Sequence, residues 1–185
     1  MSGQISTDEH WRGDGAIDVH THIVPDRLPV YAGRHIDMPW PSIERKDACH
    51  AQVMISGRVY RAIDDGWWNV GRRCVGMDAM GARHQVLSSM PELLSYWLPT
   101  EDATSLAAHL NEFIAGMVAA APDRFAGLGT VTLQDPEAAA RKLGSVVNEL
   151  GLSGVEIGCN VLVRHARAEA PESGSAAPDG GSAVL

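Results

Sequence analysis

Two histidines, His20 and His22, are separated by a single residue and follow a short, mostly apolar segment, residues 16–19. Residues two apart along a β-strand project from the same face, so both imidazoles would point the same way if this segment is a strand. Imidazole is a good ligand for zinc and for other divalent metals. The pair therefore predicts two ligands of a catalytic metal. The alternative is a chance His-x-His in a loop, because so short a spacing is unspecific.

The other histidines show no ligand spacing of this kind. His165 lies close to Arg164 and Arg167, whose charges disfavour a nearby dication, so it is a poor candidate for a third ligand. Asp18 lies between positions expected to face the core and is interpreted as structural. The remaining histidines are expected at the surface or partly buried: His10, His35, His50, His84 and His109.

The composition is that of one acidic domain. Of 185 residues, 45% are apolar, which is enough for a hydrophobic core. The formal charge is -8 and the 15 basic residues are scattered, so no nucleic-acid partner is predicted. The sequence shows no N-terminal signal and no apolar stretch long enough for a bilayer, so no membrane partner is expected. Cys49, Cys74 and Cys159 are odd in number and far apart, which favours reduced thiols and a cytoplasmic location.

The histidine pair needs a strand to position it, and residues 16–20 are expected to form a buried one. Four prolines between residues 25 and 41 exclude a long helix directly after it. Residues 52–55 and 58–63 flank Ser56-Gly57, which is typical of a hairpin turn. A small β-hairpin insertion over about residues 50–64 is therefore predicted.

The rest of the chain alternates between helices and strands. The expected elements are a helix over residues 70–82, a strand over 85–89, a helix over 104–121, a strand over 125–133, a helix over 136–150 and a strand over 154–158. Gly81 is a helix stop, Thr104 is an expected N-cap, and Asp135-Pro136 is a typical helix start. Such alternation predicts an α/β fold with a parallel sheet, either doubly wound or half of a (β/α)8 barrel. A metal pair at the end of the first strand, with no glycine-rich loop after it, favours the barrel.

Six blocks of the sequence, in order and at compatible spacings, resemble one known family. Residues 17–25, Ile-Asp-Val-His-Thr-His-Ile-Val-Pro, resemble the opening of the amidohydrolase superfamily in its aminocarboxymuconate-semialdehyde decarboxylase branch. The other blocks are residues 57–61, 73–80, 85–97, 122–136 and 154–158. The resemblance implies a partial (β/α)8 TIM barrel over residues 16–160, about the first four βα units.

The resemblance also implies a chemistry. Zn2+, or another divalent metal, would be held by His20, His22, a later histidine and a late aspartate, and Arg61 would grip the carboxylate of a small unsaturated or aromatic acid that loses carbon dioxide. The late aspartate and the acid–base histidine match no position here, so the catalytic residues stay unassigned. For Arg61 the alternative is a solvated hairpin arginine. For the chain, the alternatives are a metal-dependent hydrolase or hydratase, and a non-catalytic relic or docking subunit.

The two ends of the chain are expected to lack regular structure. Residues 1–15 form a loose lead, and residues 161–185, rich in Ala, Gly and Ser, read as a disordered tail that resembles no fifth strand. The abrupt change suggests a hypothesis in which the reading frame shifted, or the gene was truncated, near Cys159. A half-barrel leaves a strand edge unpaired, so we expect association through that edge or as a homodimer, and little or no turnover.

Overall fold

A computed structural model of the chain describes residues 15–33 and 38–159. Apart from Gly15, the expected N-terminal lead lies outside these residues, and so does the expected tail over residues 161–185. His10, His35 and His165 also lie outside them. Among the described residues, no helix is both long and apolar enough to cross a membrane.

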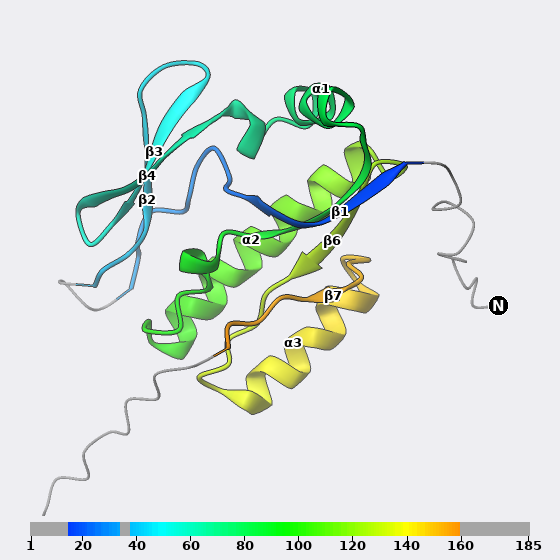
Figure 1. Cartoon of the computed structure of the whole chain (residues 1–185). Coiled ribbons are helices and arrows are strands. Elements are labelled where there is room, and N and C mark those ends of the chain that lie inside the picture. The colour runs from blue at the N-terminus through cyan, green and yellow to red at the C-terminus, as the bar shows by residue number, and fades with distance from the viewer. Residues whose placement is uncertain (1–14, 34–37, 160–185) are drawn as a thin grey trace, which may run out of the picture.

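A four-stranded parallel sheet forms the centre of the structure (Figure 1). Its strands follow one another in chain order: β1 (Ala16–Ile23), β5 (Ala82–Ser89), β6 (Phe125–Gly129) and β7 (Gly154–Val155). Helices connect successive strands, as parallel pairing requires. The predicted α/β class is therefore confirmed, and the unbroken strand order is the one that a barrel would have.

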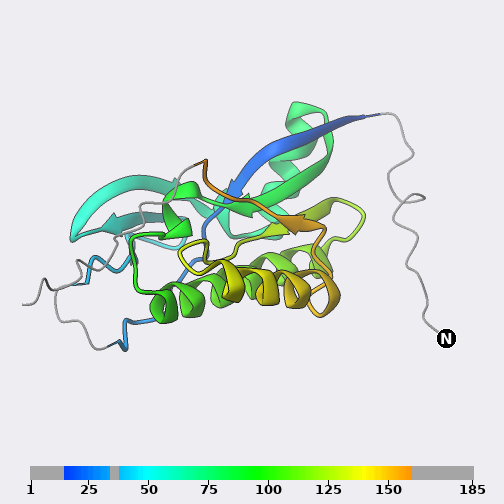
Figure 2. The ribbon, with the colours of Figure 1, turned by 90° about the horizontal axis from the view of Figure 1, so that it is seen from below.

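Three helices cover the sheet: α1 (Val70–Met80), α2 (Thr100–Ala120) and α3 (Pro136–Asn148). Figures 1 and 2 show α2 and α3 side by side along one face of the sheet. The predicted stop of α1 is confirmed, because Gly81 ends the helix with a left-handed φ of 72°. The predicted start of α3 is also confirmed, because Asp135 caps the helix by accepting a hydrogen bond from the Ala138 amide. Two short 3-10 helices, η1 (Asp65–Trp67) and η2 (Pro91–Leu94), complete the set.

The predicted start of α2 is wrong. The helix begins at Thr100, after Pro99, so Thr104 lies inside it rather than at its cap. The Thr104 hydroxyl instead lies 3.4 Å from the Thr132 hydroxyl. Proline ends the preceding segment, and Glu101 with Asp102 in the first turn complement the positive end of the helix.

A second sheet stands beside the first and is antiparallel: β2 (Ser42–Arg45), β3 (His50–Ile55) and β4 (Arg58–Asp64), in that order. The hairpin β3–β4 and its turn at Ser56-Gly57 are confirmed, and both turn residues have positive φ. β2 was not predicted. Four residues with Ile43 as their single apolar member are too short and too polar to show a strand period.

Two hydrophobic clusters hold these layers together. One joins the parallel sheet to the helices, and its members include Ile23, Met77, Leu87, Ile114 and Phe125. The other packs the small sheet against η2 and α2, and its members include Val53, Ile63, Leu93, Leu106 and Leu110. The expectation that residues 16–20 form a buried strand is right about the strand but wrong about its burial, because none of these residues is buried and burial in β1 begins at Thr21. Ile17 is 47% exposed and Val19 70% exposed, and β1 is an edge strand within the described residues.

Candidate metal site

His20 and His22 lie together near the carboxyl end of β1. Their ring centroids are 4.9 Å apart, with an interplanar angle of 75°. His20 is exposed, whereas the His22 side chain is 18% exposed. Within residues 15–33 and 38–159, no group of three or more His, Cys, Asp or Glu side chains is placed to hold a metal ion. The two rings therefore share one site, and their role as metal ligands stays a prediction.

An irregularity in β1 shapes this end of the strand. The pairing of β1 with β5 shifts between Asp18 and Thr21, so β1 has one more residue there than its partner. Such a bulge interrupts the ladder, and here the Asp18 carboxylate accepts a hydrogen bond of 3.2 Å from the His20 amide. Gln85 on β5 donates to the other Asp18 oxygen at 3.3 Å. Asp18 thus stabilises the backbone that carries the histidines, in keeping with its predicted structural role.

Arg73, on α1, holds the backbone of His22. Its guanidinium donates two hydrogen bonds of 3.2 Å to the His22 carbonyl oxygen. It also donates to the Gly66 carbonyl at 3.1 Å and to the Gln85 side-chain oxygen at 2.8 Å. Burial lowers the pKa of Arg73, while the nearby Asp18 carboxylate acts in the opposite direction. A half-buried cation with this many acceptors fixes the end of β1 against α1.

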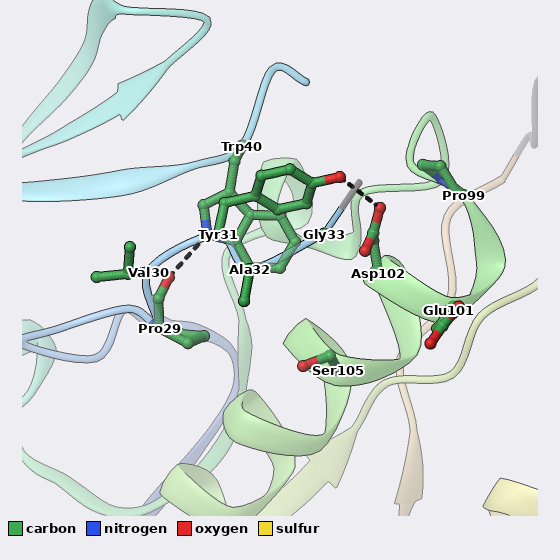
Figure 3. A pocket seen from close by; sticks show the side chains of 10 residues that line it. All are labelled: Pro29, Val30, Tyr31, Ala32, Gly33, Trp40, Pro99, Glu101, Asp102 and Ser105. Atoms are coloured by element: carbon green, nitrogen blue, oxygen red, sulfur yellow. Dashed lines mark hydrogen bonds between the residues drawn. The ribbon is translucent and has the colours of Figure 1, made fainter. Parts of the chain in front are cut away.

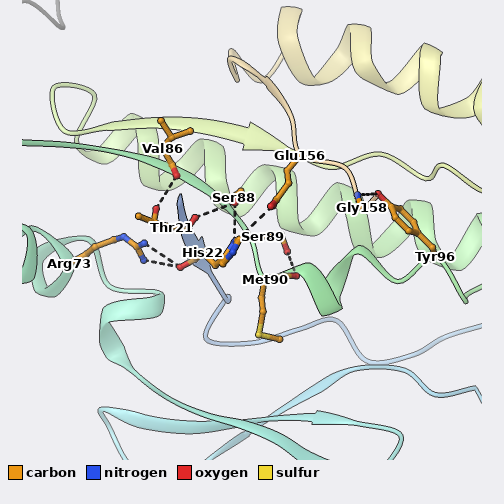
Figure 4. Close-up of polar contacts among 10 residues, drawn as sticks. All are labelled: Thr21, His22, Arg73, Val86, Ser88, Ser89, Met90, Tyr96, Glu156 and Gly158. Carbon is orange, nitrogen blue, oxygen red and sulfur yellow. Dashed lines mark hydrogen bonds and ion pairs between the residues drawn. The ribbon is translucent and has the colours of Figure 1, made fainter. Parts of the chain in front are cut away.

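Two polar side chains lie against the His22 ring (Figure 4). Ser88, directly paired with His22 in the sheet, has its hydroxyl oxygen 3.1 Å from Nδ1. Glu156, just after β7, has Oε2 at 4.0 Å from the same nitrogen. This carboxylate oxygen is buried, and no hydrogen bond to it is found among the described residues. The ends of β1, β5 and β7 therefore meet around one imidazole, as the carboxyl ends of parallel barrel strands do.

Arg61, the predicted carboxylate-binding residue, lies on β4 and is exposed. Its guanidinium carbon is 5.9 Å from the ring centroid of Trp67 and 6.0 Å from that of Tyr60. The Tyr60 hydroxyl donates to the Glu92 carboxylate, and this hydrogen bond raises the pKa of Tyr60. In the described part of the chain no contact between Arg61 and either histidine of the pair is found. Its role in substrate binding stays a prediction.

Two hollows lie near these elements. One, of about 520 Å³, runs along α1, and its lining includes His22, Trp67, Arg73 and Gln85. The other, of about 280 Å³, is drawn in Figure 3, where the Tyr31 hydroxyl donates to Asp102 at 3.0 Å. Its lining contains neither histidine of the pair, so the hollow beside α1 is the one that adjoins the candidate site.

The block Ser95-Tyr96-Trp97 follows β5 and η2. Ser95 is buried with a positive φ of 54°, and Trp97 is 40% exposed. The Tyr96 hydroxyl accepts a hydrogen bond of 3.1 Å from the Gly158 amide, which ties this loop to the segment after β7. Burial raises the pKa of Tyr96.

Three of the remaining histidines lie away from the pair. His50 contacts Asp47 at 2.9 Å on the exposed end of β3, and His109 on α2 contacts the Arg27 carbonyl at 3.1 Å. The expectation of a surface or partly buried position is wrong for His84. It lies within β5 and is 3% exposed, and burial is the main cause that lowers its pKa. The strand begins at Ala82, three residues earlier than predicted, which places His84 inside the sheet.

Sequence reasoning did not single out Arg73, Ser88 or Glu156 as site residues. Ser88 and Arg73 lie 66 and 51 positions from His22 in the chain, and only strand pairing and helix packing bring them to it. For Ser88 one signal was available. The two buried strands were expected to be adjacent and parallel, so residues near their carboxyl ends had to be neighbours.

Several known proteins are similar to this chain. No family model matches the sequence. The chain is 37% identical over 145 residues to the 2-amino-3-carboxymuconate-6-semialdehyde decarboxylase of Dictyostelium discoideum, a match that covers 78% of this chain and 40% of that protein. It is 28% identical over 154 residues to a gamma-resorcylate decarboxylase of a Polaromonas species, covering 83% of this chain and 38% of that protein.

Solved structures are also similar to more than half of the chain, and one of them has a TM-score of 0.50. It is a 5-carboxyvanillate decarboxylase from Novosphingobium aromaticivorans, complexed with manganese and 4-hydroxy-3-methoxy-5-nitrobenzoic acid. The two are 32% identical, with a TM-score of 0.50 over 57% of this chain and 30% of that one. The chain thus spans about 40% of the length of the curated relatives that it matches. It is a partial homologue of the decarboxylases of the amidohydrolase superfamily, and its four parallel strands form a partial (β/α)8 barrel.

Proposed function

We propose that this chain forms the first part of the active site of a metal-dependent carboxy-lyase, which acts on a small unsaturated or aromatic carboxylic acid. One observation carries the proposal: two imidazoles lie side by side near the carboxyl end of the first strand, in a chain homologous to decarboxylases. Active sites of (β/α)8 barrels collect at that face. The substrate class follows the relatives, whose names refer to aminocarboxymuconate semialdehyde and to gamma-resorcylate.

The residues present fit part of a metal site. His20 and His22 would hold Zn2+, which imidazole suits, or another divalent ion such as the Mn2+ bound by the solved 5-carboxyvanillate decarboxylase. When bound, the ion would activate a water molecule and stabilise negative charge on the substrate. Catalytic zinc sites normally use three protein ligands, and the described residues provide no third one in place. We therefore expect this chain alone to bind a divalent metal weakly.

Arg61 would bind the substrate carboxylate. The guanidinium forms paired hydrogen bonds with a carboxylate, and the rings of Tyr60 and Trp67 beside it offer faces for an unsaturated or aromatic acid. This role is tested by measuring the affinity for gamma-resorcylate in the presence of Mn2+ in two variants, Arg61→Gln and Arg58→Gln. Arg61→Gln is expected to weaken binding. Arg58 is an exposed arginine on the same strand, so its change is expected to leave binding unaltered. Equal losses in the two variants would count against a specific role for Arg61.

The reaction itself is tested by product analysis. Gamma-resorcylate labelled with ¹³C at the carboxyl group is incubated with the full chain and Mn2+ or Zn2+, and labelled carbon dioxide is measured. Because a third ligand is not in place, we expect little or no release. Sustained release that His20→Ala abolishes would establish the decarboxylase reaction and refute this expectation of low turnover. A hydrated product that retains the label would favour the hydratase alternative.

A docking role is a second candidate, favoured by the exposed edge of β1. Its outer half presents Ile17 and Val19 to solvent, and within the described residues β1 pairs on one side only. A second copy of this chain, or an intact homologue, could add a strand there. Sizing the chain alone and mixed with an intact homologue distinguishes the two roles. A mixed complex supports docking, and separate elution argues against it.

A further inference from the structure

The Ser88 hydroxyl lies within hydrogen-bonding distance of two atoms of β1, and one of them can only accept. Ser88 is 5% exposed and lies beside Thr21 and His22, which belong to the neighbouring strand β1. Its Oγ donates a hydrogen bond of 3.2 Å to the Thr21 carbonyl oxygen (Figure 4). A carbonyl oxygen only accepts, so this contact uses the single proton of the hydroxyl.

The second contact of the same hydroxyl then has a defined direction. His22 Nδ1 lies 3.1 Å from Ser88 Oγ, and with its proton engaged on Thr21 the oxygen can only accept. Both contacts of the Ser88 hydroxyl can be hydrogen bonds at the same time only if His22 Nδ1 carries the hydrogen. We infer that Ser88 is a positioning residue, which holds neutral His22 as the Nδ1–H tautomer and leaves Nε2 with the lone pair that binds a cation.

Glu156 acts in the same direction. Its Oε2 lies 4.0 Å from His22 Nδ1, so an ionised carboxylate there also favours a proton on this nitrogen. Ser88 and Glu156 therefore both face Nδ1. No hydrogen bond to Nε2 is found in the described part of the chain. In metal sites a ligating histidine commonly donates its other ring N–H to a fixed acceptor, and this arrangement gives His22 that property before any metal binds.

The tautomer can be observed directly. The full chain, labelled with ¹⁵N in histidine and free of metal, is studied by long-range ¹H–¹⁵N correlation at about pH 8, where imidazoles are ordinarily neutral. His22→Gln assigns the signals. The expected result is a protonated Nδ1 and an unprotonated Nε2, the reverse of the tautomer that free histidine favours in water. A His22 ring with its proton on Nε2 in the wild-type chain would overturn the inference, and this outcome depends on no variant.

Variants separate Ser88 from its surroundings. Ser88→Ala is expected to shift the tautomer ratio of His22 by about tenfold towards Nε2–H, the scale of one lost hydrogen bond. Ser88→Thr keeps the hydroxyl and should restore the wild-type pattern. Ser89→Ala is the matched control, because this neighbouring hydroxyl is equally buried but donates to the Met90 carbonyl at 3.4 Å. A Ser88→Ala chain with an unchanged His22 pattern would show that Ser88 does not set the tautomer.

The tautomer of His22 and the binding of a cation at His22 can be tested independently. The tautomer is measured without metal, whereas cation binding at His22, which rests on the proposed function, is measured by adding Mn2+ to the same samples. An Nδ1–H tautomer with no Mn2+ effect on His22 would support the role of Ser88 and refute the metal site. An Nε2–H tautomer together with Mn2+ binding at His22 would refute the role of Ser88 and keep the metal site.

Discussion

Replacing Arg73 by methionine should loosen the end of β1. The side chain donates four hydrogen bonds, two of them to the His22 carbonyl oxygen and one each to Gly66 and Gln85. Methionine keeps the aliphatic stem but donates nothing, so all of these acceptors lose their partner. The change therefore removes the hydrogen bonds by which Arg73 on α1 holds the strand that carries the histidine pair.

The magnitude follows from opposing effects. A hydrogen bond from a charged donor contributes about 1.5–3 kcal/mol to stability. Burial of the guanidinium, which lowers the pKa of Arg73, offsets part of the sum. The hollow beside α1 is lined by both Arg73 and His22, so water can reach the acceptors that the variant frees. The net loss in the free energy of unfolding should match the contribution of one hydrogen bond rather than four, about 2–3 kcal/mol.

Urea unfolding of Arg73→Met and Arg72→Met measures this difference. Arg72 is the neighbouring arginine on α1, but its side chain is 59% exposed and its ion pair with Asp65 is 3.5 Å long. Its replacement should change stability by less than about 1 kcal/mol. Equal effects of the two variants would refute the reasoning, because burial and hydrogen bonding would then not decide the outcome.

Three further predictions concern packing, a buried amide and the strand edge. Gly127→Ala places a Cβ 2.7 Å from an Ile114 methyl carbon and should destabilise by about 1–3 kcal/mol in urea unfolding, whereas Gly116→Ala, in the open on α2, should stabilise by about 0.5–1 kcal/mol. Asn111 is 5% exposed and exchanges hydrogen bonds of 2.9 and 2.7 Å with the Thr130 backbone, so Asn111→Ala should lower the melting temperature and cost about 2–3 kcal/mol. Val19→Lys should reduce concentration-dependent self-association in sizing experiments, and unchanged association would argue against the β1 edge as the contact.

Local chemistry predicted much of the fold. Asp135-Pro136 and Gly81 mark helix ends because their capping depends on adjacent residues alone. The predicted start of α2 at Thr104 is wrong because the helix follows Pro99 directly and has its acidic first turn there, and these residues mark a helix start better than Thr104 does. The exposure of Ile17 could not be predicted from its own segment, because it depends on which elements pack on that face of β1.

In the candidate site, too, one part could be predicted from local sequence and the other could not. That His20 and His22 lie together follows from strand period alone, and the structure places their rings side by side. Ser88, Arg73 and Glu156 reach His22 only through strand pairing and helix packing, which no local pattern encodes. Their roles therefore emerge from the structure.

Joint binding of one divalent cation by His20 and His22 is tested most directly by calorimetric titration of the full chain with Mn2+. If both rings bind one ion, His20→Ala and His22→Ala should each weaken binding by at least about tenfold, and the double variant should lose little more. His50→Ala, which removes the exposed histidine beside Asp47, should leave the affinity unchanged. Binding that survives both substitutions, or that depends on His50 instead, would contradict the metal site.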